Sequence, residues 1–172
     1  MAKLQILTIP DPRLKNKSQV VKNFDKNLQK KVNNMFEALY DSGNGIGLAA
    51  PQVGIFERIV IIDLKENNKL NPRVFINPKI IKKSDKKIIN EEGCLSVPEY
   101  FAEVERSEEI ELEWYSVHGE KNKLTASGLL SICLQHELDH LEGVLFIDYL
   151  SKIKKKMALE KLTKLKKKKT LK

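Results

Sequence analysis

Two histidines stand four residues apart in the segment HELDH, residues 136–140. On an α-helix each residue turns by about 100°, so His136 and His140 lie one turn apart on the same face, with Glu137 at its flank. This spacing is typical of two metal ligands accompanied by a carboxylate that acts as a base towards water. Asp139 lies on the other flank, where we expect it to support a ligand from outside rather than to bind the metal.

The helix that carries this segment is otherwise apolar. Leucine or isoleucine occupies six positions between 129 and 141 and covers nearly every side, so we predict that the helix is buried. Burying two imidazoles and two carboxylates without partners costs several kcal/mol. An H-E-x-x-H segment also arises by chance in polar helices, but in an apolar helix a bound metal ion gives these side chains a reason to be buried.

A catalytic metal site has a third protein ligand and one open position, and three parts of the chain compete for that role. The metzincin string H-x-x-G-x-x-H fails because Phe146 occupies its last position. Glu160 has the separation typical of thermolysin-like proteases, but it lies among lysines. Cys133 shares the histidine face, yet its Cα lies roughly 10.5 Å along the axis from that of His140. Cys94 comes from a separate segment and is our predicted third ligand, although a single cysteine is also common as a small core residue.

A loop of small residues, GIGLAAPQVG, spans positions 45–54. It matches the dinucleotide fingerprint G-x-G-x-x-A, but that motif follows a strand and opens a helix. Here a helix precedes the loop and Pro51 interrupts the segment after the glycines, so we predict no nucleotide cofactor. Small residues instead suit a backbone that lies against a ligand, and Gln52 offers an amide donor at the end of the loop.

Three helices are predicted around these segments. Asp25 caps the first, whose apolar residues recur with helical spacing, and Gly43 ends it. The histidine helix begins near Thr125 or Ser127 and is closed by Gly143. A third, lysine-rich helix follows residue 151.

Four segments between the first two helices are rich in β-branched and aromatic residues and are predicted strands: 57–64, 73–83, 99–106 and 108–117. Because these strands are grouped between helices and do not alternate with them, the order predicts an α+β fold.

Charge is unevenly distributed along the 172 residues. Residues 151–172 contain eleven lysines and one acid, a net charge of +10, whereas residues 1–150 carry 20 basic and 22 acidic side chains. We therefore divide the chain into a main domain, 1–150, and a basic helical extension, 151–172. Apolar runs are far shorter than the ~20 residues that cross a bilayer. The N-terminus reaches Pro10 too soon for a secretory signal, and two cysteines suit a reducing compartment. These features exclude a membrane protein and predict a cytoplasmic one.

Three blocks in series resemble the peptide deformylase family: GIGLAAPQ at 45–52, EGCLS at 92–96 and QHELDH at 135–140. Shorter matches extend the resemblance over roughly residues 4–150. The resemblance implies a hydrolase that removes the formyl group from the N-formylmethionine of nascent polypeptides and releases formate. It also implies antiparallel β-sheets packed around the helix that carries both histidines.

The resemblance implies a role for each matching residue at the metal. One divalent ion, Fe²⁺ or a substitute such as Zn²⁺, Ni²⁺ or Co²⁺, is bound by Cys94, His136 and His140. Glu137 is the general acid and base. The Gln52 amide and the Leu95 backbone N–H stabilise the oxyanion.

Other residues are expected around the substrate. On a helical wheel an apolar stripe continues the histidine face, which suits a wall for a methionine side chain but is equally typical of ordinary core: Leu129, Ile132 and Cys133. The resemblance favours the pocket and adds Ile46. Gly47 and Gly93 leave room for a substrate backbone to pair as an extra strand.

Glu92 and Arg106 match family positions that support the site, where they join Asp139. Tyr100 and Phe101 stand where the family varies, so polar contacts that some members make with substrate are not expected here.

The basic extension predicts electrostatic docking on RNA, which salt weakens; a solvated helix end is the alternative. In deformylases this helix is associated with the ribosome, so we expect that deleting residues 152–172 weakens ribosome binding and leaves hydrolysis of a short peptide nearly intact. Two other functions stay open on the residues alone. One is an H-E-x-x-H endopeptidase that uses Glu160, and the other is a metal-stabilised RNA-binding module for which Glu137 has no role.

Overall fold

The structure is a computed structural model that describes residues 3–171. Residues 1 and 2 of the predicted main domain and residue 172 of the predicted basic extension lie outside this range. Three α-helices are described: α1 (Lys26–Asp41), α2 (Gly128–Leu141) and α3 (Lys152–Thr170). The strands are β1 (Gly47–Ala49), β2 (Ile59–Asp63), β3 (Pro72–Lys83), β4 (Lys87–Cys94), β5 (Val97–Ser107), β6 (Glu109–Tyr115) and β7 (Lys121–Ser127).

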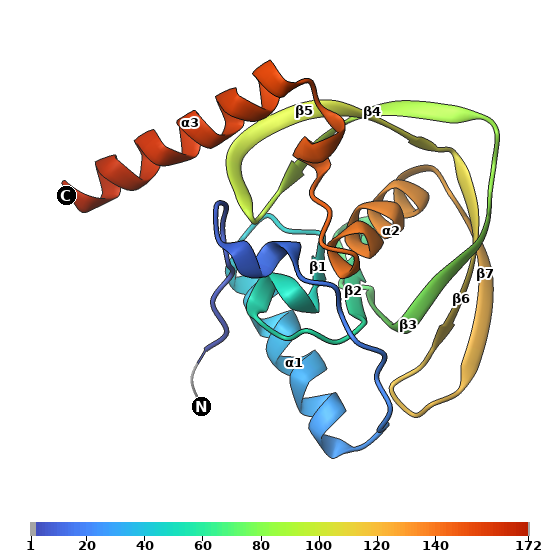
Figure 1. Ribbon diagram of the computed structural model, residues 1–172. Helices are drawn as coiled ribbons and strands as arrows, with labels where there is room; N and C mark the ends of the chain where they lie inside the picture. The colour runs from blue at the N-terminus through green and yellow to red at the C-terminus, as the bar shows by residue number, and fades with distance from the viewer. Residues whose placement is uncertain (1–2, 172) are drawn as a thin grey trace.

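All strand pairs in the two sheets are antiparallel. One sheet has the order β1-β2-β3-β6-β7, and β4 and β5 form a separate two-stranded sheet. Helix α2 lies between the two sheets, as Figure 1 shows. The predicted α+β fold, with antiparallel sheets packed around the histidine helix, is confirmed.

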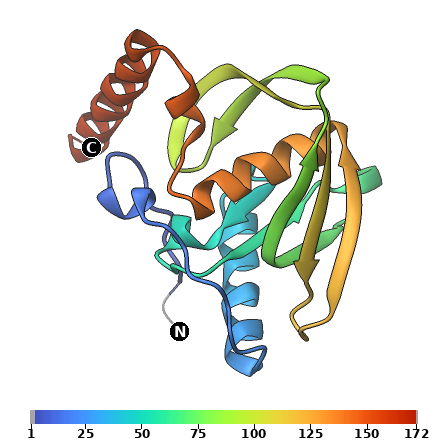
Figure 2. The same ribbon diagram turned by 45° about the vertical axis from the view of Figure 1, so that its right-hand side comes forward.

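Strand β2 separates the two helices that pack on the larger sheet. Its five residues are all buried, and their side chains alternate between the two faces. Ile59 and Ile61 pack with α1, whereas Val60 and Ile62 pack with α2. In Figure 2, α2 (orange) crosses the middle of the molecule and α1 (light blue) lies below it. The core therefore fixes α2 against a rigid sheet.

The ends of the helices agree with the predicted signals. Asp25 caps α1 by accepting a hydrogen bond from the Leu28 N–H at 3.0 Å, and Gly43 follows the helix with a φ of 85°. Helix α2 begins directly after β7, at Gly128 with a φ of 61°. Thr125 belongs to β7, so of the two predicted starts only Ser127 is correct.

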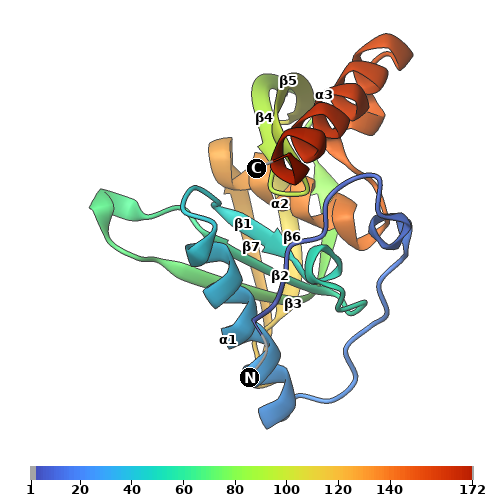
Figure 3. The ribbon, with the colours of Figure 1, turned by 90° about the vertical axis from the view of Figure 1, so that its left-hand side faces the viewer.

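Helix α3 packs against β5 and also contacts the N-terminal segment, where Lys166 Nζ donates to the Ile9 carbonyl oxygen at 3.2 Å. Only its C-terminal end projects from the rest of the molecule (Figure 1). Figure 3 shows it beside the β4–β5 sheet. Ala158 and Leu162 are buried in a cluster with Val97, Val104 and Phe146. The extension therefore contributes two residues to the core of the main domain.

The strand predictions were incomplete. Segments 87–94 and 121–127 form β4 and β7 although neither has a strand-like composition. The predicted loop 45–54 contains the short edge strand β1, followed by a turn of 3₁₀-helix. Among residues 3–171, no helix is both long and apolar enough to cross a membrane.

Candidate metal centre and active site

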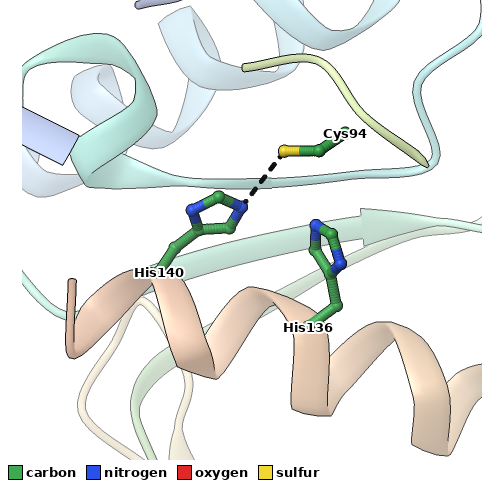
Figure 4. Close-up of side chains that lie close together, drawn as sticks. All are labelled: Cys94, His136 and His140. Carbon is green, nitrogen blue, oxygen red and sulfur yellow. Dashed lines mark hydrogen bonds between the residues drawn. The ribbon is translucent and has the colours of Figure 1, made fainter. Parts of the chain in front are cut away.

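Three side chains from two elements converge beside α2. Cys94 ends β4, and His136 and His140 lie one turn apart on the face of α2 that faces it (Figure 4). Cys94 Sγ lies 3.4 Å from His140 Nε2, and one donor atom from each of the three residues lies within 4.8 Å of the others. This is the spacing of ligands on a single ion with bonds of about 2.0–2.3 Å.

The three donors also fit a divalent ion chemically. A carboxylate accepts and does not donate, so the 2.8 Å contact with Glu92 places a proton of His136 on Nδ1 and makes Nε2 the nitrogen for a metal. Burial lowers the pKa of His136, but hydrogen bonds with Cys94 and Glu92 outweigh it and raise the pKa well above its ordinary value, so a metal ion at Nε2 displaces a proton. Burial holds the pKa of His140 well below its ordinary value, so this imidazole is neutral, the form that binds metal. One sulfur and two imidazole nitrogens suit Zn²⁺ and Fe²⁺.

A buried ionic network lies behind His136. Arg106 donates from Nε and Nη2 to the two oxygens of Glu92, both at 2.8 Å, and from Nη1 to Asp139 at 2.6 Å. Burial alone raises the pKa of Glu92, but hydrogen bonds from Arg106 and His136 lower it to about 2. The sequence placed Asp139 beside a ligand; the structure instead joins it to Arg106, and Glu92 contacts the imidazole directly.

Glu137 projects from α2 towards β1. A Cβ added at Gly47 would lie 2.8 Å from Glu137 Oε1, so glycine is required for the carboxylate to occupy this place. Burial raises the pKa of Glu137 to about 7, and its Oε2 is buried with no partner within residues 3–171. A carboxyl group with such a pKa can take up and release a proton near neutral pH.

The Gln52 side chain is held by three contacts. Its Oε1 accepts from the Ala49 N–H at 2.9 Å, and its Nε2 lies 3.0 Å from Ser96 Oγ and 3.5 Å from Cys94 Sγ. The amide donor is therefore fixed next to the thiol. Leu95 lies beside it on the wall of the same pocket.

A pocket of about 430 Å³ opens over these groups. Every predicted substrate residue lines it: Ile46, Gly47, Gly93, Leu129, Ile132 and Cys133. Leu129 and Ile46 are exposed at the rim, whereas Ile132 and Cys133 are buried. Of the three predicted supporting residues, Glu92 lines the pocket and Arg106 and Asp139 do not.

Sequence reasoning missed three residues near the site. Ser96 orients the Gln52 amide, Phe101 lies against Gly93 on the pocket wall, and Tyr149 donates to Asp139 at 2.9 Å. Phe101 gave a signal as a departure from the family pattern, and Ser96 as the last residue of the EGCLS block, whereas Tyr149 gave none. Ser96 and Tyr149 are ordinary in type, and only the fold shows their contacts.

The competing ligands are separated from the centre. Glu160 is exposed on α3 and lies 3.9 Å from Lys156, and the metal-binding group found within residues 3–171 does not include it. Cys133 is a free thiol whose pKa burial raises to about 12, so it stays protonated on the pocket wall.

Comparison with known proteins shows the family of the chain. The family model described as polypeptide deformylase matches residues 3–156. The chain belongs to the peptide deformylase family. A peptide deformylase from Zymomonas mobilis is 49% identical over 169 residues, covering 95% of each chain.

Solved structures of deformylases are similar over nearly the whole chain. The deformylase from Legionella pneumophila has a TM-score of 0.92 at 41% identity and covers 99% of both chains. That of Ehrlichia chaffeensis in complex with actinonin has a TM-score of 0.88 at 40% identity, over 95% of this chain and 98% of that chain. Deformylases are metal-dependent hydrolases that remove the formyl group from N-formylmethionine of nascent peptides, and membership of the family confirms that prediction for this chain.

Proposed function

We propose that Cys94, His136 and His140 hold one divalent ion and that Glu137 moves the proton in deformylation. The observation that carries this proposal is the convergence of a thiol and two imidazoles beside a buried carboxyl group at one pocket. When bound, the ion supplies a Lewis acid and lowers the pKa of water so that it attacks a carbonyl at neutral pH.

Glu137 accepts the proton of the attacking water and delivers it to the nitrogen of the leaving amine. Its raised pKa, about 7, suits both transfers. The bond between the formyl carbon and the amine nitrogen then breaks, and the products are formate and a peptide with a free N-terminal methionine.

Gln52 and Leu95 stabilise the negative charge that develops on the formyl oxygen. The Gln52 amide is oriented before substrate binds, because its oxygen is occupied by the Ala49 N–H. A donor that needs no reorganisation is most effective in the transition state, and losing one typically costs about 10²–10³ in rate. The Leu95 backbone N–H is the second donor.

The methionine side chain of the substrate packs on the apolar part of the pocket. This surface is formed by Leu129, Ile132 and Cys133 on α2 and by Ile46 from the loop before β1. Gly47 and Gly93 line the pocket, and we place the substrate backbone beside them, paired as in strand addition.

Fe²⁺ is our proposal for the native ion, with Zn²⁺, Ni²⁺ or Co²⁺ in purified samples. The test is formate release from formyl-Met-Ala-Ser by anaerobically purified protein, with metal analysis of the same sample. Glu137→Gln should keep the metal and lose at least about 10²-fold in kcat. Full activity of this variant would contradict the proposed proton transfer, whereas no formate release by the unmodified protein would favour the non-catalytic module.

The endopeptidase alternative makes the opposite prediction for two variants. We expect Cys94→Ser to lose the metal and Glu160→Gln to keep it, because Glu160 is exposed on α3. Loss of metal from Glu160→Gln alone would overturn our ligand set.

We propose that residues 1–150 form the catalytic domain and that the basic extension, 151–172, docks on ribosomal RNA. The lysines of α3 support this, since they can neutralise phosphates.

Because Ala158 and Leu162 are buried, deletion of 152–172 also removes core residues, so charge reversal is the cleaner test. Exposed Lys161, Lys164 and Lys168 changed together to glutamate should weaken ribosome binding and leave hydrolysis of formyl-Met-Ala-Ser within twofold. Unchanged ribosome binding at low salt would refute the docking. A cytoplasmic location stays a prediction from the N-terminal sequence and the two cysteines.

A further inference from the structure

The ionic network behind His136 continues to the protein surface, where it ends on Tyr149. Tyr149 Oη donates to Asp139 Oδ2 at 2.9 Å, and the same oxygen accepts from Arg106 Nη1 at 2.6 Å. Arg106 then binds both oxygens of Glu92, and Glu92 accepts from His136 Nδ1 at 2.8 Å. An unbroken chain of hydrogen bonds thus joins a surface phenol to the imidazole.

Tyr149 contacts this network in two ways. Besides the hydrogen bond, its ring centre lies 5.0 Å from the guanidinium carbon of Arg106, within cation–π distance. Arg106 and Glu92 are buried, with side chains 5% and 4% exposed, whereas the Asp139 side chain is 24% exposed. Asp139 is therefore the member of the network most open to water, and Tyr149 is the side chain that covers it.

The backbone beneath Tyr149 is held in place. Tyr149 ends the short 3₁₀-helix Phe146–Tyr149, in which Phe146 and Ile147 are buried. The Phe146 ring stacks on His136 with ring centres 6.0 Å apart. Burial and the charge of Asp139 raise the pKa of Tyr149, so its phenol stays protonated and acts as the donor. A fixed donor of this kind restricts the orientation of the carboxylate it binds.

We propose that Tyr149 is a positioning residue for the metal centre: by holding Asp139 and covering Arg106, it keeps Glu92 on His136 Nδ1 and so raises the affinity of the site for a divalent ion. This inference rests on the proposed ligand set. An exposed tyrosine with an incidental hydrogen bond is the alternative, and it predicts no effect on metal binding.

The experiment is a titration of metal-free, full-length protein with Zn²⁺ against a chromophoric chelator. Tyr149→Phe removes only the hydroxyl group, and Tyr100→Phe is the matched control. Tyr100 Oη also donates one exposed hydrogen bond, to the Lys154 carbonyl at 3.1 Å, but none of its hydrogen bonds involves Arg106 or Asp139. We expect the Kd of Zn²⁺ to rise roughly fivefold in Tyr149→Phe, below the effect of about 10–100-fold typical of a ligand's direct partner. Tyr100→Phe should leave it within twofold.

Two further readouts separate positioning from a general loss of stability. The visible spectrum of the Co²⁺-loaded protein should shift in Tyr149→Phe and not in Tyr100→Phe, while the unfolding temperatures of the two metal-free variants stay alike. In the double variant with Asp139→Asn, the phenylalanine should add no further loss of affinity, because Tyr149 acts through Asp139.

A Kd and spectrum in Tyr149→Phe equal to those of the unmodified protein would overturn the inference, as would additive losses in the double variant. If the proposed ligand set is wrong, the result differs: the unmodified protein itself does not bind one Zn²⁺ per chain.

Discussion

Gly47→Ala tests how the fold positions Glu137. The new Cβ would lie 2.8 Å from Glu137 Oε1, about 0.6 Å closer than ordinary contact. It would also lie 3.2 Å from Cδ and 3.3 Å from Cγ, so the whole carboxylate has to move. Overpacking of this kind typically costs about 1–3 kcal/mol in the free energy of unfolding.

The larger effect is expected on catalysis. A misplacement of about 1 Å can cost 10²-fold in rate, so a shift of roughly 0.6 Å should lower kcat by about tenfold to 10²-fold. The atoms nearest to the new Cβ all belong to Glu137 and none to a metal ligand, so metal content should stay at the level of the unmodified protein. The assay is formate release at saturating formyl-Met-Ala-Ser, with metal analysis and urea unfolding of the same preparation.

Gly43→Ala is the matched control. Gly43 precedes the same loop and has a φ of 85°, so alanine is strained there, but a Cβ would meet nothing within 4 Å. This variant should lose stability and keep kcat within twofold. If Gly47→Ala keeps kcat within twofold of the unmodified enzyme, or loses its metal, the account of how β1 positions Glu137 is wrong.

Three other variants probe the surroundings of the site. Glu92→Gln should weaken Zn²⁺ binding by about 10–100-fold, because it removes the charged partner of His136. The control Glu103→Gln, at an exposed position on the same sheet, should leave Zn²⁺ affinity unchanged. Equal losses of Zn²⁺ affinity in the two variants would contradict the role of the network. Leu162→Ala should lower the free energy of unfolding by about 2–4 kcal/mol in urea, because this α3 side chain is only 4% exposed; a change below about 0.5 kcal/mol would mean that α3 does not pack on the domain. Burial raises the pKa of Asp63, but hydrogen bonds from Tyr40 and two backbone amides outweigh it and hold the pKa below its ordinary 3.8. The carboxylate therefore stabilises the fold above pH 3.8, and the free energy of unfolding should fall as the pH drops below that value. Asp63→Asn should be less stable at pH 7, and its stability should depend less on pH in the acid range. An acid unfolding profile equal to that of the unmodified protein would refute this role of Asp63.

The helices could be predicted because their signals are local. Asp25 caps α1 as expected, and Ser151 caps α3, the lysine-rich helix predicted to follow it. The H-E-x-x-H spacing alone placed two imidazoles on one face. Cys94 was chosen over Cys133 because it comes from a segment outside the histidine helix, and the structure brings its sulfur to His140.

The strands that were missed depend on tertiary contacts. The inward face of β4 carries Asn90 and Glu92 where a core strand would carry apolar residues, because that face builds the site. Strand β7 is an edge strand with two exposed lysines, Lys121 and Lys123, a composition that also protects an edge from pairing. No local pattern marks either segment as a strand.

The network behind His136 was only partly predictable. Family positions indicated Glu92 and Arg106, and the helical wheel indicated Asp139. That one guanidinium joins both carboxylates depends on the packing of β5 against α2 and on Tyr149, which lies ten residues after Asp139. Such long-range contacts have no signature in a single sequence.

The metal content of two cysteine variants tests the central claim most directly. Cys94 and Cys133 are the two cysteines of the chain, and both are free thiols near the pocket. We predict one divalent ion per chain in the unmodified protein and in Cys133→Ala, and less than a tenth of that in Cys94→Ala purified in the same way. A full complement of metal in Cys94→Ala, or its loss from Cys133→Ala alone, would contradict the proposed centre.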